Sequence, residues 1–353
     1  MKLQKVLGGI EMLKIGLIGF GFMGRMHFDN YERLMNEGHP IQLRAICDIQ
    51  IEQLKSSKAE GNMATEKEIY DLSPYRLYEN IEDMLAKEQL DMIDITLPTF
   101  LHAELTCNLL ERGYHVFCEK PASRNAADAR IMAETASKHG KKLMIGQCLR
   151  FWPAYEVLKE NVESGRLGQV TGGYFFRGSE APKGWFMNGD LSGGCLLDMH
   201  IHDTDMIHWL FGKPEKVSTL GRTVVSTNGY DIVSTNYVYP DGKVINAQAD
   251  WTLEGDHGFE MTYRVNFEQG NMVFKNGTVH INPKSEAGYV AELSPDAGYY
   301  RELLYFTNAI VNETSLDTCS PESAAGTMEI IEAELQSADQ GGAWVDTNKL
   351  VSL

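Results

Sequence analysis

Residues 193–212 read GGCLLDMHIHDTDMIHWLFG and hold three histidines and three aspartates among apolar side chains. A helix brings residues four and seven positions apart onto one face, so Asp198, His202 and Asp205 are expected to align. An imidazole beside a carboxylate can take up or release a proton near neutral pH, which suits acid–base catalysis. The same residues also suit a metal site with helical ligand spacing, or a buried helix whose polar groups only cap and pair.

The acid–base interpretation is preferred over a metal site, because no cysteine or distant histidine pair completes a ligand set. We therefore predict no metal here, with His202 as the proton acceptor and Asp198 as its polar partner. His200 and His208 fall on other faces of the helix and are expected to be structural. Cys195 is expected to be a small buried thiol rather than a reactive one.

A glycine-rich stretch, GLIGFGFMGRMH, covers residues 16–27 at the end of a strand-like run. In this pattern Gly19 permits a tight turn, Gly21 lets a pyrophosphate approach the backbone, and Gly24 allows close packing of helix and strand. The following helix start offers partial positive charge to an anion. The stretch predicts a dinucleotide-binding loop made by Gly19, Phe20, Gly21, Phe22, Met23 and Gly24.

The next strand-like run ends at Asp48, 24 residues beyond Gly24. A carboxylate at this place accepts hydrogen bonds from a ribose diol and repels a 2′-phosphate. No lysine or arginine follows before Lys55, although Arg44 on the same strand keeps the alternative open. The predicted cofactor is therefore NAD in preference to NADP.

Two further strands end in polar stretches, TLPTFLH at 96–102 and CEKPAS at 118–123. Ligands of open parallel sheets bind beyond these carboxyl ends. An ammonium there, that of Lys120, can polarise a substrate oxygen and stabilise an alkoxide, whereas the alternative is an ordinary solvated lysine. The residues expected around the cofactor at these ends are Thr96, Pro98, His102, Glu119 and Lys120.

The elements that must position these residues change type along the chain. Up to about residue 147, apolar runs alternate with amphipathic stretches, which predicts an α/β Rossmann domain with a parallel sheet over residues 12–147. Its strands are expected at 13–20, 41–48, 91–98, 114–121 and 141–148, and its helices at 80–90, 102–113 and 125–140.

From residue 148 on, helices are expected at 153–168, 193–212 and 321–337. Strand-like runs at 216–225, 231–253 and 259–281 contain hairpin turns, at Asp241-Gly242, Gln269-Gly270 and Asn276-Gly277, that favour antiparallel pairing. We predict an α+β domain over residues 148–353 with one open, largely antiparallel sheet. The uncovered face of such a sheet predicts a homodimer or homotetramer.

Composition excludes several classes of function. The 353 residues carry 49 acidic and 32 basic side chains, and a net charge of −17 disfavours nucleic acid. No apolar stretch is long enough to span a membrane, and residues 1–11 are expected to be an extension rather than a signal peptide. Six scattered cysteines without a CxxC pair are typical of reduced thiols, so a cytoplasmic location is expected.

Several motifs occur together in one order: the glycine loop, Pro98-x-x-x-His102, Glu119-Lys120-Pro121, and a later GG-x-x-x-D-x-x-x-H-D. In this combination the chain resembles the glucose–fructose oxidoreductase, inositol dehydrogenase and MocA family over nearly its whole length. The resemblance implies an NAD(P)-dependent oxidoreductase that acts on a polyol, a sugar or a related ring. It also implies that Lys120, Asp198 and His202 meet the reacting carbon.

Substrate contacts are less clearly marked. Gln147 and Arg150 open the second predicted domain, and Trp185 lies in a glycine- and proline-containing loop, so these three are weaker candidates alongside Asp198 and His202. Two alternatives to a dehydrogenase stay open. One is a glycoside hydrolase that retains NAD and oxidises its substrate transiently, and the other is a non-catalytic NAD-binding protein.

Overall fold

The computed structural model describes residues 12–54 and 70–349. Contacts divide the chain into two compact units. The first contains the chain up to Lys120, Arg130–Gly146 and Tyr299–Pro321. The second contains Pro121–Ala129, Gln147–Gly298 and the chain from Glu322 onward. The expectation for residues 1–11 and the position of Lys55 both lie outside the described residues.

The first unit contains a parallel sheet of six strands in the order β3-β2-β1-β4-β5-β6. Its inner strands are almost wholly buried, as expected of a sheet covered on both faces. The Rossmann prediction is confirmed. The strands are β1 (Leu13–Ile18), β2 (Ile41–Cys47), β3 (Arg76–Tyr78), β4 (Met92–Ile95), β5 (His115–Glu119) and β6 (Leu143–Gly146).

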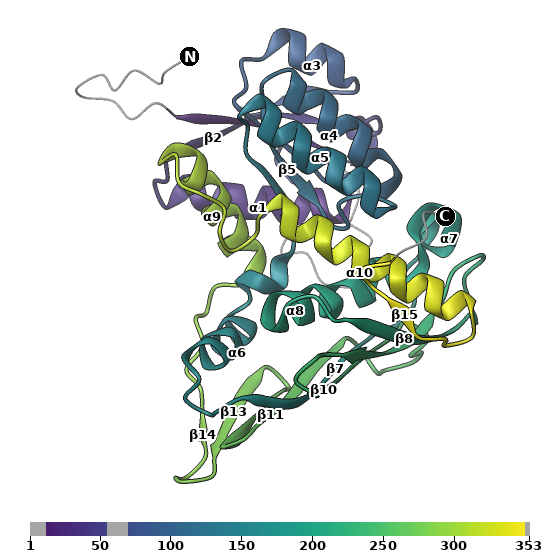
Figure 1. Cartoon of the computed structure of the whole chain (residues 1–353). Coiled ribbons are helices and arrows are strands. Elements are labelled where there is room, and N and C mark those ends of the chain that lie inside the picture. Colours follow the sequence, from purple (N-terminus) through teal and green to yellow (C-terminus); the bar gives the residue numbers. More distant parts are fainter. Residues whose placement is uncertain (1–11, 55–69, 350–353) are drawn as a thin grey trace. The chain divides into compact units, whose positions relative to one another are not determined.

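Helices cover both faces of this sheet. Figure 1 shows α3, α4 and α5 together on one face, with α1 and α9 on the other. The strand order reverses between β1 and β4, which is where ligands of such sheets bind. The helices are α1 (Phe22–Asn36), α2 (Ile51–Leu54), α3 (Ile81–Lys87), η1 (Thr99–Leu101), α4 (His102–Glu111), α5 (Ala126–His139) and α9 (Gly298–Val311).

The second unit contains a nine-stranded sheet in the order β14-β13-β12-β11-β7-β10-β9-β8-β15. All its neighbours pair antiparallel except β7 and β10, so the expected largely antiparallel sheet is confirmed. Its strands are β7 (Val170–Gly178), β8 (Lys216–Arg222), β9 (Ile232–Val238), β10 (Val244–Asp250), β11 (Glu260–Phe267), β12 (Gly270–Lys275), β13 (Thr278–Pro283), β14 (Tyr289–Val290) and β15 (Val345–Asp346).

The hairpin turns follow the local sequence. Asn276 and Gly277 both have positive φ, of 50° and 76°, which gives the turn that best matches the twist of paired strands. Gly242, in the turn between β9 and β10, also has positive φ. The predicted turns at these two places are therefore formed as expected.

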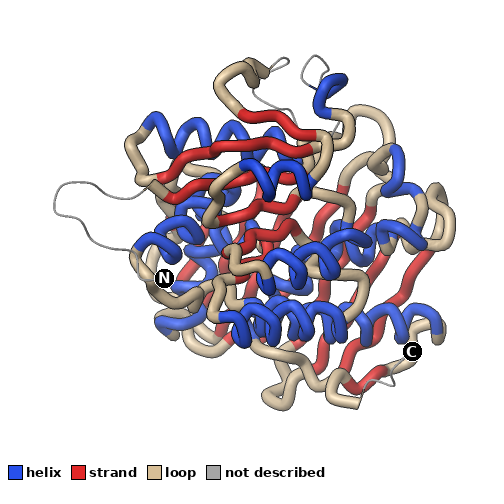
Figure 2. Tube along the Cα trace, turned by 90° about the horizontal axis from the view of Figure 1, so that it is seen from above, coloured by secondary structure: helices blue, strands red, loops and turns tan. Residues whose placement is uncertain are grey.

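One face of the second sheet is buried and the other is open. Along β10, Ile245, Ala247 and Ala249 are buried, whereas Val244, the first residue of the strand, is exposed. Figure 2 distinguishes the helices (blue) from the strands (red). The helices of this unit are η2 (Cys148–Phe151), α6 (Pro153–Ser164), η3 (Gly184–Met187), α7 (Gly189–Ser192), η4 (Leu196–His200), α8 (Ile201–Phe211) and α10 (Pro321–Asp339). Among the described residues of the whole chain, no helix has the length and apolarity needed to cross a membrane.

Candidate active site

The glycine loop connects β1 to α1 and is shaped by close backbone approaches. A Cβ on Gly24 would lie 2.1 Å from the carbonyl oxygen of Gly19, and Gly19 itself has φ +94°. A Cβ on Gly21 would meet nothing within 4 Å. Gly19 is thus needed for the turn and Gly24 for close packing, while the space over Gly21 fits a pyrophosphate at the start of α1.

Two side chains hold this loop in place. Asp48 accepts hydrogen bonds from the backbone N–H groups of Phe20 and Gln50, both at 2.8 Å. The Thr96 hydroxyl donates to the carbonyl oxygen of Gly19 at 2.9 Å. The Phe20 ring is fully buried, so only its backbone faces the loop, whereas Phe22 and Met23 are partly exposed at the helix start.

The predicted cofactor residues at the other strand ends differ in accessibility. Pro98 precedes η1, and the buried His102 ring contacts the carbonyl oxygen of Leu97 at 2.7 Å. Glu119 is buried at the end of β5, and Lys120 directly after it is partly exposed. Lys120 can therefore reach a ligand at the sheet edge, while Glu119 points into the interior.

Glu119 belongs to a buried cluster that the sequence analysis did not anticipate. His27 lies between two carboxylates, with Nδ1 2.8 Å from Asp94 Oδ2 and Nε2 3.0 Å from Glu119 Oε1. Tyr31 also donates to Asp94, at 2.8 Å. Glu302 of α9 completes the cluster. The residue in the sequence that could have indicated this cluster is Asp94, because a carboxylate within an apolar strand requires a buried partner.

The charges of this cluster shift its protonation equilibria. Burial alone would lower the pKa of His27, but the charge of Asp94 and the hydrogen bonds to Asp94 and Glu119 raise it well above its usual value. Burial, and then the charge of Glu119, raise the pKa of Glu302 well above its usual range. The ligand-type atoms of His27, Glu119 and Glu302 lie within 4.8 Å of one another, but carboxylates already occupy both imidazole nitrogens.

The segment 193–212 is not one regular α-helix as expected. Residues Leu196–His200 form a π-turn, which contains Asp198, and His202 lies in the first turn of α8. A π-turn is wider than an α-turn, so the four-residue spacing argument does not hold across this junction. Such turns are frequent at functional sites.

Burial separates the six polar side chains of this segment. His200, Asp203 and Asp205 are buried, and His208 contacts the Thr327 hydroxyl at 3.0 Å. Asp198 and His202 are partly exposed, as is His208. Cys195 is fully buried, and burial followed by the charge of Asp198 raises the pKa of its thiol well above the usual value, which makes it unreactive.

Two expectations need correction. Asp205 does not share a site-facing side of the helix with His202 but forms a bidentate ion pair with Arg150, at 2.8 and 2.6 Å. Both side chains are only 1% exposed, so neither is available to a substrate. Thr327 of α10 donates a further hydrogen bond to Asp205, and the group joins α8 to the start of the unit. We therefore remove Arg150 from the substrate candidates.

The other weak substrate candidates have different surroundings. Gln147 is 2% exposed, and its amide oxygen has no hydrogen-bond partner among the described residues. Trp185 lies on η3, partly exposed, and stacks on Phe186 with ring centroids 4.1 Å apart. An aromatic pair of this kind offers a flat apolar surface to a ring-shaped molecule.

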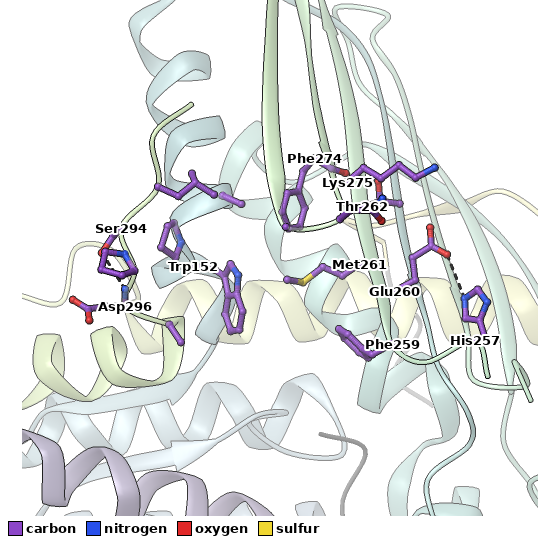
Figure 3. Close-up of a pocket in the computed structure, with 17 residues that line it drawn as sticks. Trp152, His257, Phe259, Glu260, Met261, Thr262, Phe274, Lys275, Ser294 and Asp296 are labelled. Atoms are coloured by element: carbon purple, nitrogen blue, oxygen red, sulfur yellow. Dashed lines mark hydrogen bonds and ion pairs between the residues drawn. The ribbon is translucent and has the colours of Figure 1, made fainter. Parts of the chain in front are cut away.

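A cavity of about 650 Å³ lies elsewhere in the second unit (Figure 3). Trp152, Met261 and Phe274 give it an apolar wall, and Glu260 pairs with His257 at 3.3 Å on its rim. None of the predicted site residues lines it. This cavity is therefore separate from the residues whose chemistry was predicted.

The parallel sheet and the glycine loop at its switch point are those of a Rossmann dinucleotide-binding domain, which an α+β domain follows. Two models of one protein family match this chain. Residues 13–147 match the NAD-binding Rossmann fold of the oxidoreductase family, and residues 155–273 match the GFO/IDH/MocA C-terminal domain. The chain belongs to the Gfo/Idh/MocA oxidoreductase family, which confirms the resemblance seen in its motifs.

Several proteins resemble the chain at moderate identity. An uncharacterized oxidoreductase, YrbE of Bacillus subtilis, is 28% identical over 85% of this chain and 87% of its own length. Myo-inositol 2-dehydrogenase of Thermotoga maritima is 30% identical over 60% of this chain, and the match spans 59% of that relative. A levoglucosan dehydrogenase structure, in complex with NADH and levoglucosan, has a TM-score of 0.83 at 20% identity, covering 96% of this chain and all of that one.

Proposed function

We propose that the protein is an NAD-dependent dehydrogenase that oxidises a ring or chain hydroxyl group of a polyol or sugar-like substrate, of the inositol type. The observation that carries this proposal is the burial pattern of segment 193–212. Of its six polar side chains, Asp198, His202 and His208 remain partly exposed, and Asp198 and His202 are the two that belong to the motif GG-x-x-x-D-x-x-x-H-D. Relatives named as inositol and D-glucoside dehydrogenases support the substrate class.

Oxidation of an alcohol removes a hydride from carbon and a proton from oxygen. NAD, when bound at the glycine loop, supplies the hydride acceptor. We assign the proton to His202, whose imidazole is suited to accept it near neutral pH, with Asp198 orienting the ring or binding a substrate hydroxyl. Lys120 polarises the reacting oxygen and stabilises the developing alkoxide.

The test is a panel of inositols, sugars and sugar acids, assayed with NAD and with NADP by the absorbance of the reduced cofactor. We expect steady formation of NADH with at least one polyol or sugar. A hydrolase that retains NAD would cleave glycosides without releasing NADH, and a non-catalytic binding protein would turn over nothing.

With the best substrate, His202→Asn is expected to lower kcat by about 100-fold or more, the usual contribution of a general base. His280→Asn is the matched control, because His280 is an exposed histidine on β13. Near-normal turnover by the His202 variant would refute the assignment.

We also propose that the open face of the second sheet joins copies of this chain into a homodimer or homotetramer in the cytoplasm. The six cysteines, all among the described residues, form no disulfide, which supports a reducing compartment. Val244 on β10 and Leu220 on β8 are 71% and 62% exposed, which supports a self-association surface. Light scattering should give two or four times the chain mass, and Val244→Lys should lower it. A monomeric wild type would refute the proposal.

A further inference from the structure

We propose that His27 is a positioning residue for Lys120. Clamped as an imidazolium between Asp94 and Glu119, it fixes the Glu119 carboxylate and, through it, the main chain that carries the Lys120 side chain. The part of this inference that concerns catalysis rests on the proposed function, whereas the part that concerns His27 and Lys120 themselves does not.

A continuous set of short contacts runs from α1 to Lys120. His27 on α1 contacts Asp94 of β4 at 2.8 Å and Glu119 of β5 at 3.0 Å. The other Glu119 oxygen accepts the backbone N–H of Lys120 at 3.1 Å. The two links to His27 are buried, since His27 and Asp94 are 0% exposed and Glu119 is 4% exposed, and the link to the Lys120 N–H is partly buried. The main chain at Lys120 is therefore held from the interior of the sheet.

The hydrogen-bond partners dictate the charge of the imidazole. A neutral imidazole carries one N–H, but both nitrogens of His27 face carboxylate oxygens. Only the doubly protonated ring donates to both, and two anions then compensate its charge. Tyr31 adds a third donor on the same helix, directed at Asp94.

Glu302 is the remaining titratable group that faces His27, and it comes from α9. It is fully buried, and neither carboxylate oxygen has a hydrogen-bond partner among the described residues. A buried carboxyl group in that state keeps its proton. With Glu302 neutral, Asp94 and Glu119 are the anions that hold the imidazolium.

Glu119 has little room to rearrange. A Cβ on Gly146 of β6 would lie 2.9 Å from Glu119 Oε1, so the neighbouring strand is already in close contact with the carboxylate. If His27 is replaced by a neutral side chain, Glu119 loses its compensating cation in a buried site. It must then take up a proton or turn, and either change weakens its hold on the Lys120 N–H.

The first measurement does not depend on turnover. Nitrogen-15 NMR of the histidine rings, with His27→Gln used for assignment, should show both His27 nitrogens still protonated well above pH 6.5, the usual pKa of a histidine side chain. Loss of a proton between pH 6 and 8 would overturn the imidazolium. A stoichiometric metal ion found by elemental analysis of the purified protein would overturn it as well, since a metal would need a ring lone pair.

The second measurement reports on Lys120 directly, also without turnover. Acylation of Lys120 by an amine-reactive reagent, followed by mass spectrometry across pH, should change severalfold in rate in His27→Gln. His115→Gln is the matched control, because His115 lies on the same strand β5 at the end away from Lys120. Equal labelling in wild type and His27→Gln would refute the positioning role.

The third measurement is kinetic and uses the substrate found for the proposed function. His27→Gln should lower kcat about 10- to 100-fold while KM and the affinity for NADH change less than about threefold. Combining it with Glu119→Gln should cost little more than either change alone, because the two residues act as one unit. Additive losses, or a loss of NADH affinity equal to the loss of kcat, would indicate a merely structural role.

If His27→Gln fails to fold, Asp94→Asn tests the same chain of contacts from the other side of the ring. It should shift the His27 resonances and the Lys120 labelling in the same direction. If the wild type turns over no substrate, the proposed function fails, while the NMR and labelling results still decide whether His27 holds Lys120 in place.

Discussion

At the scale of single residues, Asp48 shapes the glycine loop and is also the residue that we propose binds the cofactor ribose. Its two oxygens accept the N–H groups of Phe20 and Gln50, so the carboxylate shapes the glycine loop from the end of β2. Each oxygen has a second lone pair, which leaves capacity for the ribose hydroxyl groups of a dinucleotide. The same negative charge disfavours a 2′-phosphate, so we propose that cofactor choice, like the loop geometry, depends on this side chain.

Replacement of this charge is predicted to weaken cofactor discrimination. In Asp48→Asn we expect the affinity for NADH to fall about tenfold, the equivalent of one charge-assisted hydrogen bond. The affinity for NADPH should fall less, because the repulsion of its phosphate is removed. Fluorescence titration with both cofactors measures this, with exposed Asp83→Asn on α3 as the control. An unchanged NADH-to-NADPH ratio would contradict the assignment.

At the scale of elements, the start of α1 shows how a helix and a strand are brought close enough to form a ligand site. Gly24 lies in the first turn of α1. The carbonyl oxygen of Gly19, just after β1, leaves no room there for a side chain. Gly21 borders open space. The two glycines therefore serve different purposes, although they belong to one motif.

Alanine substitutions should separate these purposes. Gly24→Ala is expected to destabilise the first unit by several kcal/mol, because its Cβ would lie 2.1 Å from a backbone oxygen that cannot move freely. Gly21→Ala should fold with nearly unchanged stability but bind NADH more weakly, since its methyl group occupies the pyrophosphate position. Thermal unfolding and NADH titration of both variants provide the comparison. Equal behaviour of the two would argue against the loop geometry.

At the scale of the whole molecule, the buried titratable groups make stability depend on pH. Glu334 of α10 is fully buried and accepts from the Thr204 hydroxyl at 3.1 Å. Burial raises its pKa from 4.5 to about 8, against the hydrogen bonds of Tyr237 and Thr204, which lower it. Nearby His200 has its pKa lowered to about 3 by burial and by Arg177, so the pair is neutral at physiological pH.

The sign of the effect follows from proton binding. Between pH 4.5 and about 8 the folded state holds the Glu334 proton and the unfolded chain does not, so stability falls as pH rises. The slope is at most about 1.4 kcal/mol per pH unit for one proton. Relative to Glu334→Gln, the wild type should lose stability across this window in urea unfolding. Exposed Glu322→Gln on the same helix is the control, and a pH-independent difference would contradict the prediction.

The sequence by itself determined the features that depend on local pattern. Alternating apolar runs specified the parallel sheet, glycine spacing specified the loop, and Asn-Gly and Asp-Gly pairs specified hairpin turns. The family motifs pointed to Lys120, Asp198 and His202, whose roles stay a prediction. These features were readable because neighbouring residues and backbone geometry alone decide them.

The tertiary structure alone decided which polar groups are buried and with whom they pair. Asp205 meets Arg150, 55 residues away, instead of facing a substrate. Helix α9, which the sequence analysis did not identify, delivers Glu302 to a cluster that also contains His27 and Glu119. The π-turn at Asp198 likewise depends on packing. Burial and the choice of partner arise from contacts between distant segments, so the spacing of residues along one segment does not predict them.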